Sequence, residues 1–203
     1  MKLSKDLWNE RYLNQDIGWD VGHISTPLKE YFDQLENKNI KILIPGCGNA
    51  YEAEYLHLLG FNNIFLIDWA QKALDDFLKR TPEFPKEQLI YGDFFKHQGQ
   101  YDLIIEQTFF CAILPELRED YVIQMKKLLA ENGKLVGLLF NDKLYSNRPP
   151  FGGKKSDYEK LFSKQLGDNN ETLHRIKVCF WPWKIINSGA SCLPFSVKAK
   201  NVF

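Results

Sequence analysis

The stretch KILIPGCG, residues 41–48, constrains the fold more than any other part of the sequence. An apolar run that ends at Pro45 and Gly46 is typical of a buried strand running into a tight turn. Strand and helix patterns alternate beyond it. Strands are predicted at 41–45, 63–68, 88–93, 101–106 and 134–140, and helices at 52–59, 71–79, 117–129 and 156–162. This alternation predicts an α/β fold with a mostly parallel sheet and helices on both faces.

Two helices are predicted before the first strand, over 4–14 and 26–36. Ser4 and Thr26 suit N-cap positions, and Pro27 suits the first position of the second helix. The sequence thus predicts an N-terminal helical segment, residues 1–37, ahead of the sheet.

The pattern is weaker at the other end of the chain. The letters ENG at 131–133 predict a turn, and after Gln165 only two apolar runs, 176–181 and 193–197, suggest strands. We treat 166–203 as an atypical C-terminal tail and expect a single domain over 1–203, because a chain of this length buries one ordinary core.

Composition excludes several classes of function. Lys and Arg (26) balance Asp and Glu (26), so the basic surface needed to hold nucleic acid is not expected. The N-terminal letters MKLSKDLWNERY contain no apolar signal region, and no stretch approaches a membrane span. Four scattered cysteines without a CxxC pair and four scattered histidines without ligand spacing predict reduced thiols and no metal. We expect a monomeric, cytoplasmic protein.

The turn after the first strand predicts a nucleoside site. Gly46 and Gly48 would let a ligand approach the backbone, and Asp68 ends the next strand 20 residues beyond Gly48, where it can accept hydrogen bonds from ribose hydroxyls. The third glycine of a dinucleotide fingerprint is replaced by Tyr51, so a nucleoside without a pyrophosphate fits better. The alternative is that the glycines only form a turn and Asp68 only caps the following helix.

The third strand ends in a further acid. Asp93 and Phe94 follow it in YGDFF, where a carboxylate beside an aromatic ring suits an adenine that is bound at its amino group and stacked. A glycine turn, an acid and an acid–aromatic pair at three successive strand ends favour ligand binding over chance.

These residues resemble the class I S-adenosylmethionine-dependent methyltransferases. More narrowly, the chain resembles the thiopurine S-methyltransferase family and the thiol and halide methyltransferases. The likeness rests on WNERY and GWDVGHISTPL in the N-terminal leader, residues 8–28, and on YDLIIEQTFFCAILPELREDY in the fourth-strand segment. The likeness runs from about residue 8 to about residue 164. It implies a Rossmann-like fold with a seven-stranded type of sheet, a helical lid, and S-adenosyl-L-methionine as cofactor.

The resemblance also implies roles for individual residues. The leader of the family folds over the cofactor, which implies contacts from Trp8, Tyr12 and Trp19, with the tryptophan rings facing the sulfonium charge. The alternative is that these rings only anchor a helix. Gln107 occupies another cofactor-contacting position, where relatives often have Arg or Tyr. Nothing after Gln165 matches the basic PR..GRE signature of relatives, and we ascribe this to a divergent or frame-shifted C-terminus.

The expected reaction is methyl transfer from S-adenosylmethionine to a small soft nucleophile: a thiol, thiopurine, hydrosulfide or halide. No catalytic residue is assigned, because such acceptors need alignment more than acid–base chemistry. Phe109, Phe110, Cys111 and the RPPFGG stretch, 148–153, are candidates for the acceptor pocket, although core packing and a plain turn explain them as well. Asp20 and His23 are left as candidates for substrate orientation or thiol deprotonation. The alternatives are methylation at oxygen or nitrogen of a small metabolite, and a cofactor-binding module without activity.

Overall fold

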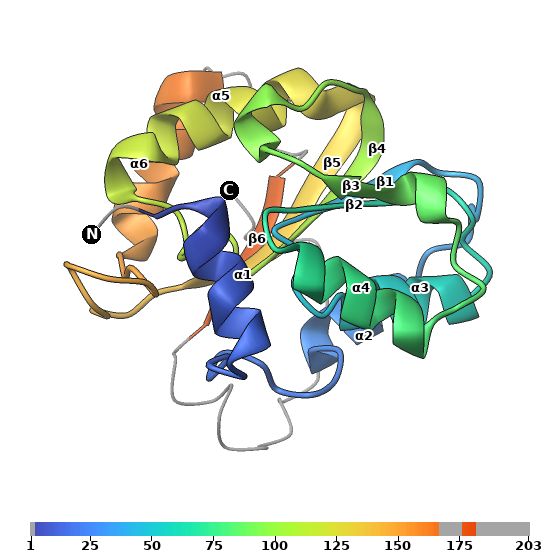
Figure 1. The fold of residues 1–203 in the computed structure, drawn as a ribbon. Helices are drawn as coiled ribbons and strands as arrows, with labels where there is room; N and C mark the ends of the chain where they lie inside the picture. The colour runs from blue at the N-terminus through green and yellow to red at the C-terminus, as the bar shows by residue number, and fades with distance from the viewer. Residues whose placement is uncertain (1–2, 167–175, 182–203) are drawn as a thin grey trace. The chain divides into compact units, whose positions relative to one another are not determined.

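A computed structural model describes residues 3–166 and 176–181 of the chain (Figure 1). Contacts within the chain group it into two compact units, residues up to 98 and residues from 99 onward, which we describe in turn.

The first unit contains a parallel sheet in the order β3-β2-β1. Its strands are β1 (Ile42–Pro45), β2 (Ile64–Asp68) and β3 (Leu89–Tyr91). All four residues of β1 are buried, as expected for a central parallel strand. Because the strands are parallel, their carboxyl ends lie at one edge of this sheet.

The helices of the first unit follow the predicted pattern. They are α1 (Lys5–Leu13), α2 (Thr26–Phe32), α3 (Tyr51–Leu58) and α4 (Gln71–Arg80), with short 3-10 turns η1 (Lys86–Gln88) and η2 (Phe94–Lys96). Figure 1 shows α3 and α4 on the same face of the sheet. On α4, helical spacing buries Ala73, Leu74 and Phe77, so one side of the helix packs inward.

The two N-cap predictions have different outcomes. Ser4 caps α1, and its Oγ accepts a hydrogen bond from the Leu7 N–H at 3.2 Å. The Thr26 prediction is wrong, because Thr26 is the first residue of α2 and Ser25 precedes it without a side-chain cap. The helix also ends at Phe32 rather than near 36, since the polar stretch that follows offers little apolar surface to bury.

The second unit contains a parallel sheet in the order β4-β5-β6. Its elements are β4 (Tyr101–Gln107), η3 (Pro115–Leu117), α5 (Arg118–Leu128), β5 (Leu129–Phe140), α6 (Lys155–Leu166) and β6 (Ile176–Trp181). Helices α5 and α6 lie side by side in Figure 1 and contact each other.

The turn predicted at 131–133 is replaced by an irregular part of β5. Tyr101 pairs with Leu129 and Leu103 with Lys134, so the strand bulges between these partners. Asn132 takes a φ of +62°, which a turn-forming residue tolerates. The turn letters therefore distort the strand without ending it.

The predicted strand at 176–181 is confirmed as β6, which pairs in parallel with β5. The other predicted run, 193–197, lies outside the described residues, and so does most of the tail for which we expect a divergent sequence.

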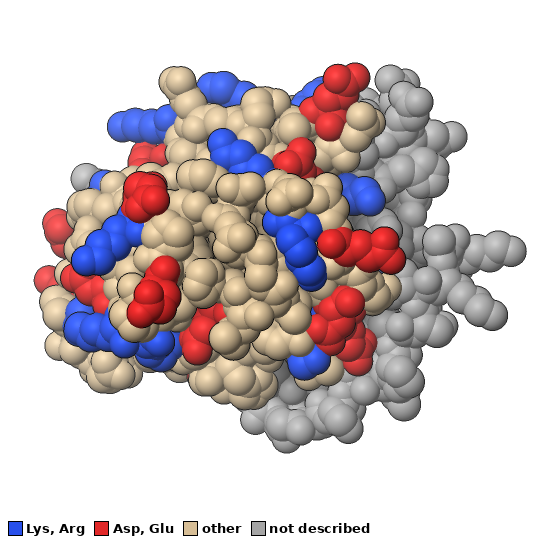
Figure 2. All heavy atoms as spheres, turned by 90° about the vertical axis from the view of Figure 1, so that its right-hand side faces the viewer, with Lys and Arg blue, Asp and Glu red and all other residues tan. Residues whose placement is uncertain are grey.

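The surface carries mixed charge. On the described part of the face in Figure 2, basic and acidic side chains are interspersed and neither sign forms a continuous patch. The described helices include none that is long and apolar enough to cross a membrane. Cys47 and Cys111 are free thiols, and the described His, Cys, Asp and Glu side chains form no cluster suited to a metal ion.

Candidate functional site

The glycine turn follows β1 at the carboxyl edge of the first unit. Gly46 and Gly48 have φ angles of +56° and +52°, a left-handed conformation that side chains with a Cβ disfavour. The Gly46 N–H donates to the carbonyl of Ile67 on β2 at 2.8 Å. The tight turn predicted from the sequence is confirmed.

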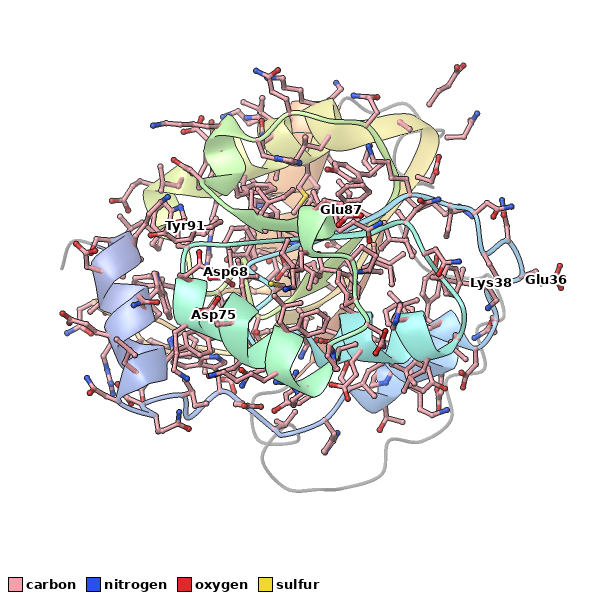
Figure 3. The ribbon with its side chains drawn as sticks, turned by 45° about the vertical axis from the view of Figure 1, so that its right-hand side comes forward. Glu36, Lys38, Asp68, Asp75, Glu87 and Tyr91 are labelled. Carbon is pink, nitrogen blue, oxygen red and sulfur yellow. The ribbon has the colours of Figure 1, made fainter. Side chains whose placement is uncertain are left out.

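Asp68 connects this turn to the next helix. Its Oδ2 accepts from the Gly48 N–H at 2.9 Å, and its Oδ1 accepts from the Ala70 N–H at 2.7 Å, just before α4. Figure 3 shows Asp68 at the end of β2 beside Tyr91 of β3. Burial raises the pKa of Asp68, and the backbone donors act in the opposite direction. The Trp69 N–H is a third backbone donor to this carboxylate. An ionised carboxylate has about four acceptor positions, so acceptor capacity remains for a ligand hydroxyl.

Tyr12 of α1 packs against the same glycine. A Cβ on Gly48 would lie 2.5 Å from the Tyr12 Oη, closer than atoms can approach. Tyr12 is 5 % exposed, and burial, with a smaller effect of Asp68, raises the pKa of its hydroxyl. The missing side chain at Gly48 thus gives the leader a place to dock.

The aromatic residues of the leader form one cluster. The Trp19 ring meets the rings of Trp8 and Tyr12 edge to face, with centroids 5.6 and 5.8 Å apart. The cluster packs on Ala70 and Ala73 at the start of α4. Edge-to-face pairs of this kind each contribute about 0.5–1.5 kcal/mol beyond their buried area. The rings therefore do anchor α1, as one interpretation of the sequence holds.

A second contact fixes α1 on α4. The Asn9 Oδ1 accepts from the Lys72 N–H at 2.9 Å, which satisfies a free donor in the first turn of α4. The Arg11 guanidinium lies 4.4 Å from the Trp19 ring centroid and pairs with Asp16 at 2.9 Å. Because Arg11 covers part of the Trp19 ring, a contact between that ring and a sulfonium stays a prediction.

Asp93 and Phe94 lie after β3, as predicted. The Asp93 carboxylate accepts from the Phe95 N–H at 3.0 Å and so caps η2. The Phe94 ring is 4 % exposed and meets Phe95 edge to face at 5.3 Å. Their contact with an adenine stays a prediction.

Eight of the nine predicted cofactor residues therefore belong to the first unit, and Gln107 ends β4 in the second. Its Oε1 is buried and has no hydrogen-bond donor among the described residues. A buried acceptor without a partner is costly and suggests that another group meets it.

Glu106, beside Gln107, has structural partners. Its Oε1 accepts from the N–H groups of Phe109 and Phe110 at 2.9 Å each, and its Oε2 accepts from the Tyr121 hydroxyl at 2.6 Å. Burial raises the pKa of Glu106 to about 7, against the effect of these donors. Glu106 thereby holds the chain that leaves β4.

Two of the residues proposed for the acceptor pocket, Phe110 and Cys111, are buried. Phe110 is 1 % exposed and packs against Tyr158 and Phe162, so the core interpretation is confirmed for it. The Cys111 thiol donates to the Thr108 carbonyl at 3.1 Å, and burial raises its pKa. A buried, protonated thiol is a poor nucleophile.

Arg118 holds the RPPFGG stretch. Its guanidinium donates to the carbonyls of Phe151 and Gly152 at 3.1 Å each and lies 4.6 Å from the Phe110 ring centroid. The Phe151 N–H also donates to the Cys111 carbonyl at 2.7 Å. These hydrogen bonds hold the stretch in place within the second unit. Arg118 is the last residue of the PELR motif in the fourth-strand segment.

The family model for thiopurine S-methyltransferase (TPMT) matches residues 3–178. The chain belongs to this family. A relative in Arabidopsis thaliana, named "Probable thiol methyltransferase 2", is 27% identical over 164 residues, which cover 76% of this chain and 70% of that protein. A Pseudomonas aeruginosa thiopurine S-methyltransferase is 24% identical over 216 residues, covering 96% of this chain and 97% of that enzyme.

A solved structure supports the fold. The 1,6-didemethyltoxoflavin-N1-methyltransferase of Burkholderia thailandensis aligns with a TM-score of 0.66 at 12% identity, covering 80% of this chain and 75% of that one. The Rossmann-like methyltransferase fold predicted from the sequence is confirmed. The protein is an S-adenosylmethionine-dependent methyltransferase that acts on a soft nucleophile, as its family membership establishes.

Two features of the first unit fit this cofactor. Gly46 and Gly48 form a left-handed turn at the carboxyl end of β1, and the Asp68 carboxylate beside it retains acceptor capacity. Sequence reasoning also missed a neighbour, Trp69, whose Nε1 is buried without an acceptor among the described residues. Its position directly after Asp68 was the available signal.

Proposed function

We propose that S-adenosylmethionine binds at the carboxyl ends of β1, β2 and β3. In this arrangement Gly46 and Gly48 form the turn that borders the cofactor, Asp68 accepts hydrogen bonds from its ribose hydroxyls, and Asp93 and Phe94 meet its adenine. The observation that carries the proposal is the hydrogen bond between Gly48 and Asp68, which joins the turn to a carboxylate with acceptor capacity left.

The proposal gives the leader a part in the same site. Trp8, Tyr12 and Trp19 close over the cofactor, supported by the packing of Tyr12 against Gly48. Gln107 is kept as a further cofactor residue from the family resemblance, supported by its buried oxygen without a donor among the described residues.

We further propose that the acceptor is a small sulfur nucleophile that reacts as its thiolate. The proposal is supported by family membership and by relatives named for thiols and thiopurines, which share sulfur as the methylated atom. A soft, polarisable anion is well suited to attack at a methyl carbon.

The cofactor supplies an electrophilic methyl group on a sulfonium sulfur. In the reaction the acceptor sulfur forms a bond to the methyl carbon as the old carbon–sulfur bond breaks, and the electron pair of that bond stays on the departing sulfur. The thiol proton is lost to solvent beforehand. No side chain has to take a proton in the transition state.

The residues of the chain then contribute binding, alignment and exclusion of water. Alignment of two reactants can account for about 7–11 kcal/mol of a barrier. The leader cluster around Trp19 covers the turn and keeps water from the acceptor anion.

Titration of the protein with S-adenosylhomocysteine in a calorimeter tests the cofactor site. Trp8→Ala and Trp19→Ala should each raise the Kd by roughly tenfold, because each removes an aromatic contact within the leader and part of the cover over the cofactor. Tyr31→Ala, a half-buried aromatic residue of α2, is the control and should leave the affinity within about twofold. Loss of stability without loss of affinity in both tryptophan variants would return these rings to a purely anchoring role.

A panel of acceptors with isotope-labelled cofactor tests the substrate class. Labelled product from hydrosulfide, small thiols or iodide, and none from hydroxyl or amine acceptors, is the expected result. Product from an oxygen or nitrogen acceptor alone would refute the sulfur proposal. Cofactor binding without turnover on any acceptor would instead show a binding module.

We also propose a monomeric, cytoplasmic enzyme that does not bind nucleic acid. Support comes from the free thiols of Cys47 and Cys111 in the described part of the chain and from the balanced charge of the sequence. Light scattering after gel filtration should give the mass of one chain, 23.8 kDa, and a mass twice as large would refute the monomer. Cell fractionation and a gel-shift assay with duplex DNA test the other two statements.

A further inference from the structure

Asp20 lies in the connection between α1 and α2 and binds three donors. Its Oδ2 accepts from the Asn49 Nδ2 and from the Tyr51 hydroxyl, the latter at 3.2 Å, and its Oδ1 accepts from the Gly22 N–H at 2.7 Å. Two of these donors lie 29 and 31 residues away in sequence. The carboxylate therefore joins the leader to another part of the first unit.

That part is the exit of the glycine turn. Asn49 follows Gly48, and Tyr51 opens α3 after Ala50, whose φ of +54° turns the chain into the helix. Both donors therefore lie directly after the glycine turn, which forms part of the proposed cofactor site.

Asn49 and Tyr51 are in turn held in place by Arg80. Arg80, at the end of α4, donates to the Asn49 carbonyl and lies 4.8 Å from the Tyr51 ring centroid. It also pairs with Glu54 of α3 at 3.2 Å. The Asp20 carboxylate consequently meets groups that are already ordered, which lowers the entropy cost of the contact.

Asp20 directly follows Trp19. Fixing its carboxylate fixes the Trp19 backbone, and Trp19 in turn packs on Tyr12, which lies against Gly48. The leader is therefore fastened at two neighbouring residues of one turn, by packing at Gly48 and by hydrogen bonds at Asn49.

We propose that Asp20 is a positioning residue, which fastens the leader to the glycine turn and so holds Trp19 and Tyr12 over the cofactor. The inference rests on the proposed cofactor site. It differs from the hypothesis that Asp20 orients or deprotonates the acceptor, since the donors that the carboxylate meets belong to the protein's own turn.

Three variants test this role: Asp20→Ala, Tyr51→Phe and the two combined. Removing charged hydrogen bonds of this kind should raise the Kd for S-adenosylhomocysteine and the KM for S-adenosylmethionine roughly tenfold in Asp20→Ala. In Tyr51→Phe, which keeps the ring, the rise should be roughly threefold. The kcat at saturating cofactor should stay within about twofold, because the reacting groups are untouched. In the combined variant the losses should not add, since both remove one interaction.

A matched control lies on the same helix. The Tyr55 hydroxyl donates to the Asp33 carboxylate at 2.5 Å, which is likewise a tyrosine of α3 bound to an acid of the preceding segment, and neither residue is part of the glycine turn. Tyr55→Phe should leave the Kd unchanged. The double variant Asp20→Asn with Asn49→Asp again places an amide donor opposite a carboxylate. It should recover most of the affinity for S-adenosylhomocysteine that Asp20→Ala loses.

The outcomes separate this proposal from the cofactor site itself. Wild-type protein that binds S-adenosylhomocysteine together with an Asp20→Ala variant of unchanged Kd would overturn the positioning role alone. A fall in kcat with unchanged KM would also overturn it, because Asp20 would then act on the reacting groups. Wild-type protein that does not bind S-adenosylhomocysteine would overturn both. If Asp20→Ala fails to fold, an unchanged Kd in Tyr51→Phe overturns the role.

Discussion

The contact between Tyr12 and Gly48 makes a quantitative prediction about stability. Gly48→Ala places a Cβ at a φ of +52°, which costs about 1–2 kcal/mol for backbone strain. The same Cβ would lie 2.5 Å from the Tyr12 Oη, and overpacking of this kind costs about 1–3 kcal/mol more. The free energy of unfolding should therefore fall by about 2–5 kcal/mol.

Tyr12→Phe separates the two costs. Without the hydroxyl, the nearest atom to the new Cβ is the ring Cζ at 3.7 Å, an ordinary contact. Gly48→Ala should then cost only the backbone strain, so the two substitutions should couple by about 1–3 kcal/mol. Gly60→Ala is the control, because Gly60 has a φ of +86° with nothing within 4 Å of its Cβ position.

Urea unfolding followed by tryptophan fluorescence measures each free energy. Gly60→Ala should cost about the same in both Tyr12 backgrounds, and Gly48→Ala should not. A coupling below about 0.5 kcal/mol between the changes at Gly48 and Tyr12 would refute the reasoning, because the leader would then not lie against the turn.

Three further predictions concern buried groups. Burial raises the pKa of Glu52 from 4.5 to about 7, so between these values the folded protein keeps a proton that the unfolded chain has lost. Unfolding free energy should fall as pH rises through that window, by up to about 3 kcal/mol, and an unchanged slope between pH 5 and 8 in Glu52→Gln would contradict this origin. Gly137→Ala should lower the free energy of unfolding in urea by about 2 kcal/mol or more, because a Cβ would lie 2.6 Å from the Glu106 carbonyl oxygen. Gly18→Ala, with nothing within 4 Å of its Cβ position, should cost almost nothing. Arg118→Lys cannot provide two parallel donors, so amide exchange in 148–153 should become faster while the first unit stays protected, and equal exchange rates would contradict the fastening role.

Local patterns in the sequence predicted much of this protein. The apolar run before Pro45, the glycines after it and the acid at Asp68 define a strand, a turn and a neighbouring strand end without distant information. Because the carboxyl ends of adjacent parallel strands meet at one edge, the same letters also predicted where a ligand site lies. The family likeness rested on equally local stretches.

Local patterns failed where a neighbour in space decides the outcome. The ENG letters predicted a turn, but pairing with β4 extends β5 through them. Phe110 was a candidate for a pocket wall, but its neighbours on α6 place it in the core.

The sequence by itself determined the strand–turn–acid arrangement at Gly46, Gly48 and Asp68, because neighbours along the chain set backbone conformation. Only the tertiary structure decided that Tyr12 fills the space above Gly48 and that Asp20 meets Asn49. Those contacts join segments separated by tens of residues, and they form because the leader docks on α4 and on the turn. A sequence pattern specifies which side chains are available for such docking, and packing in three dimensions selects the partners they meet.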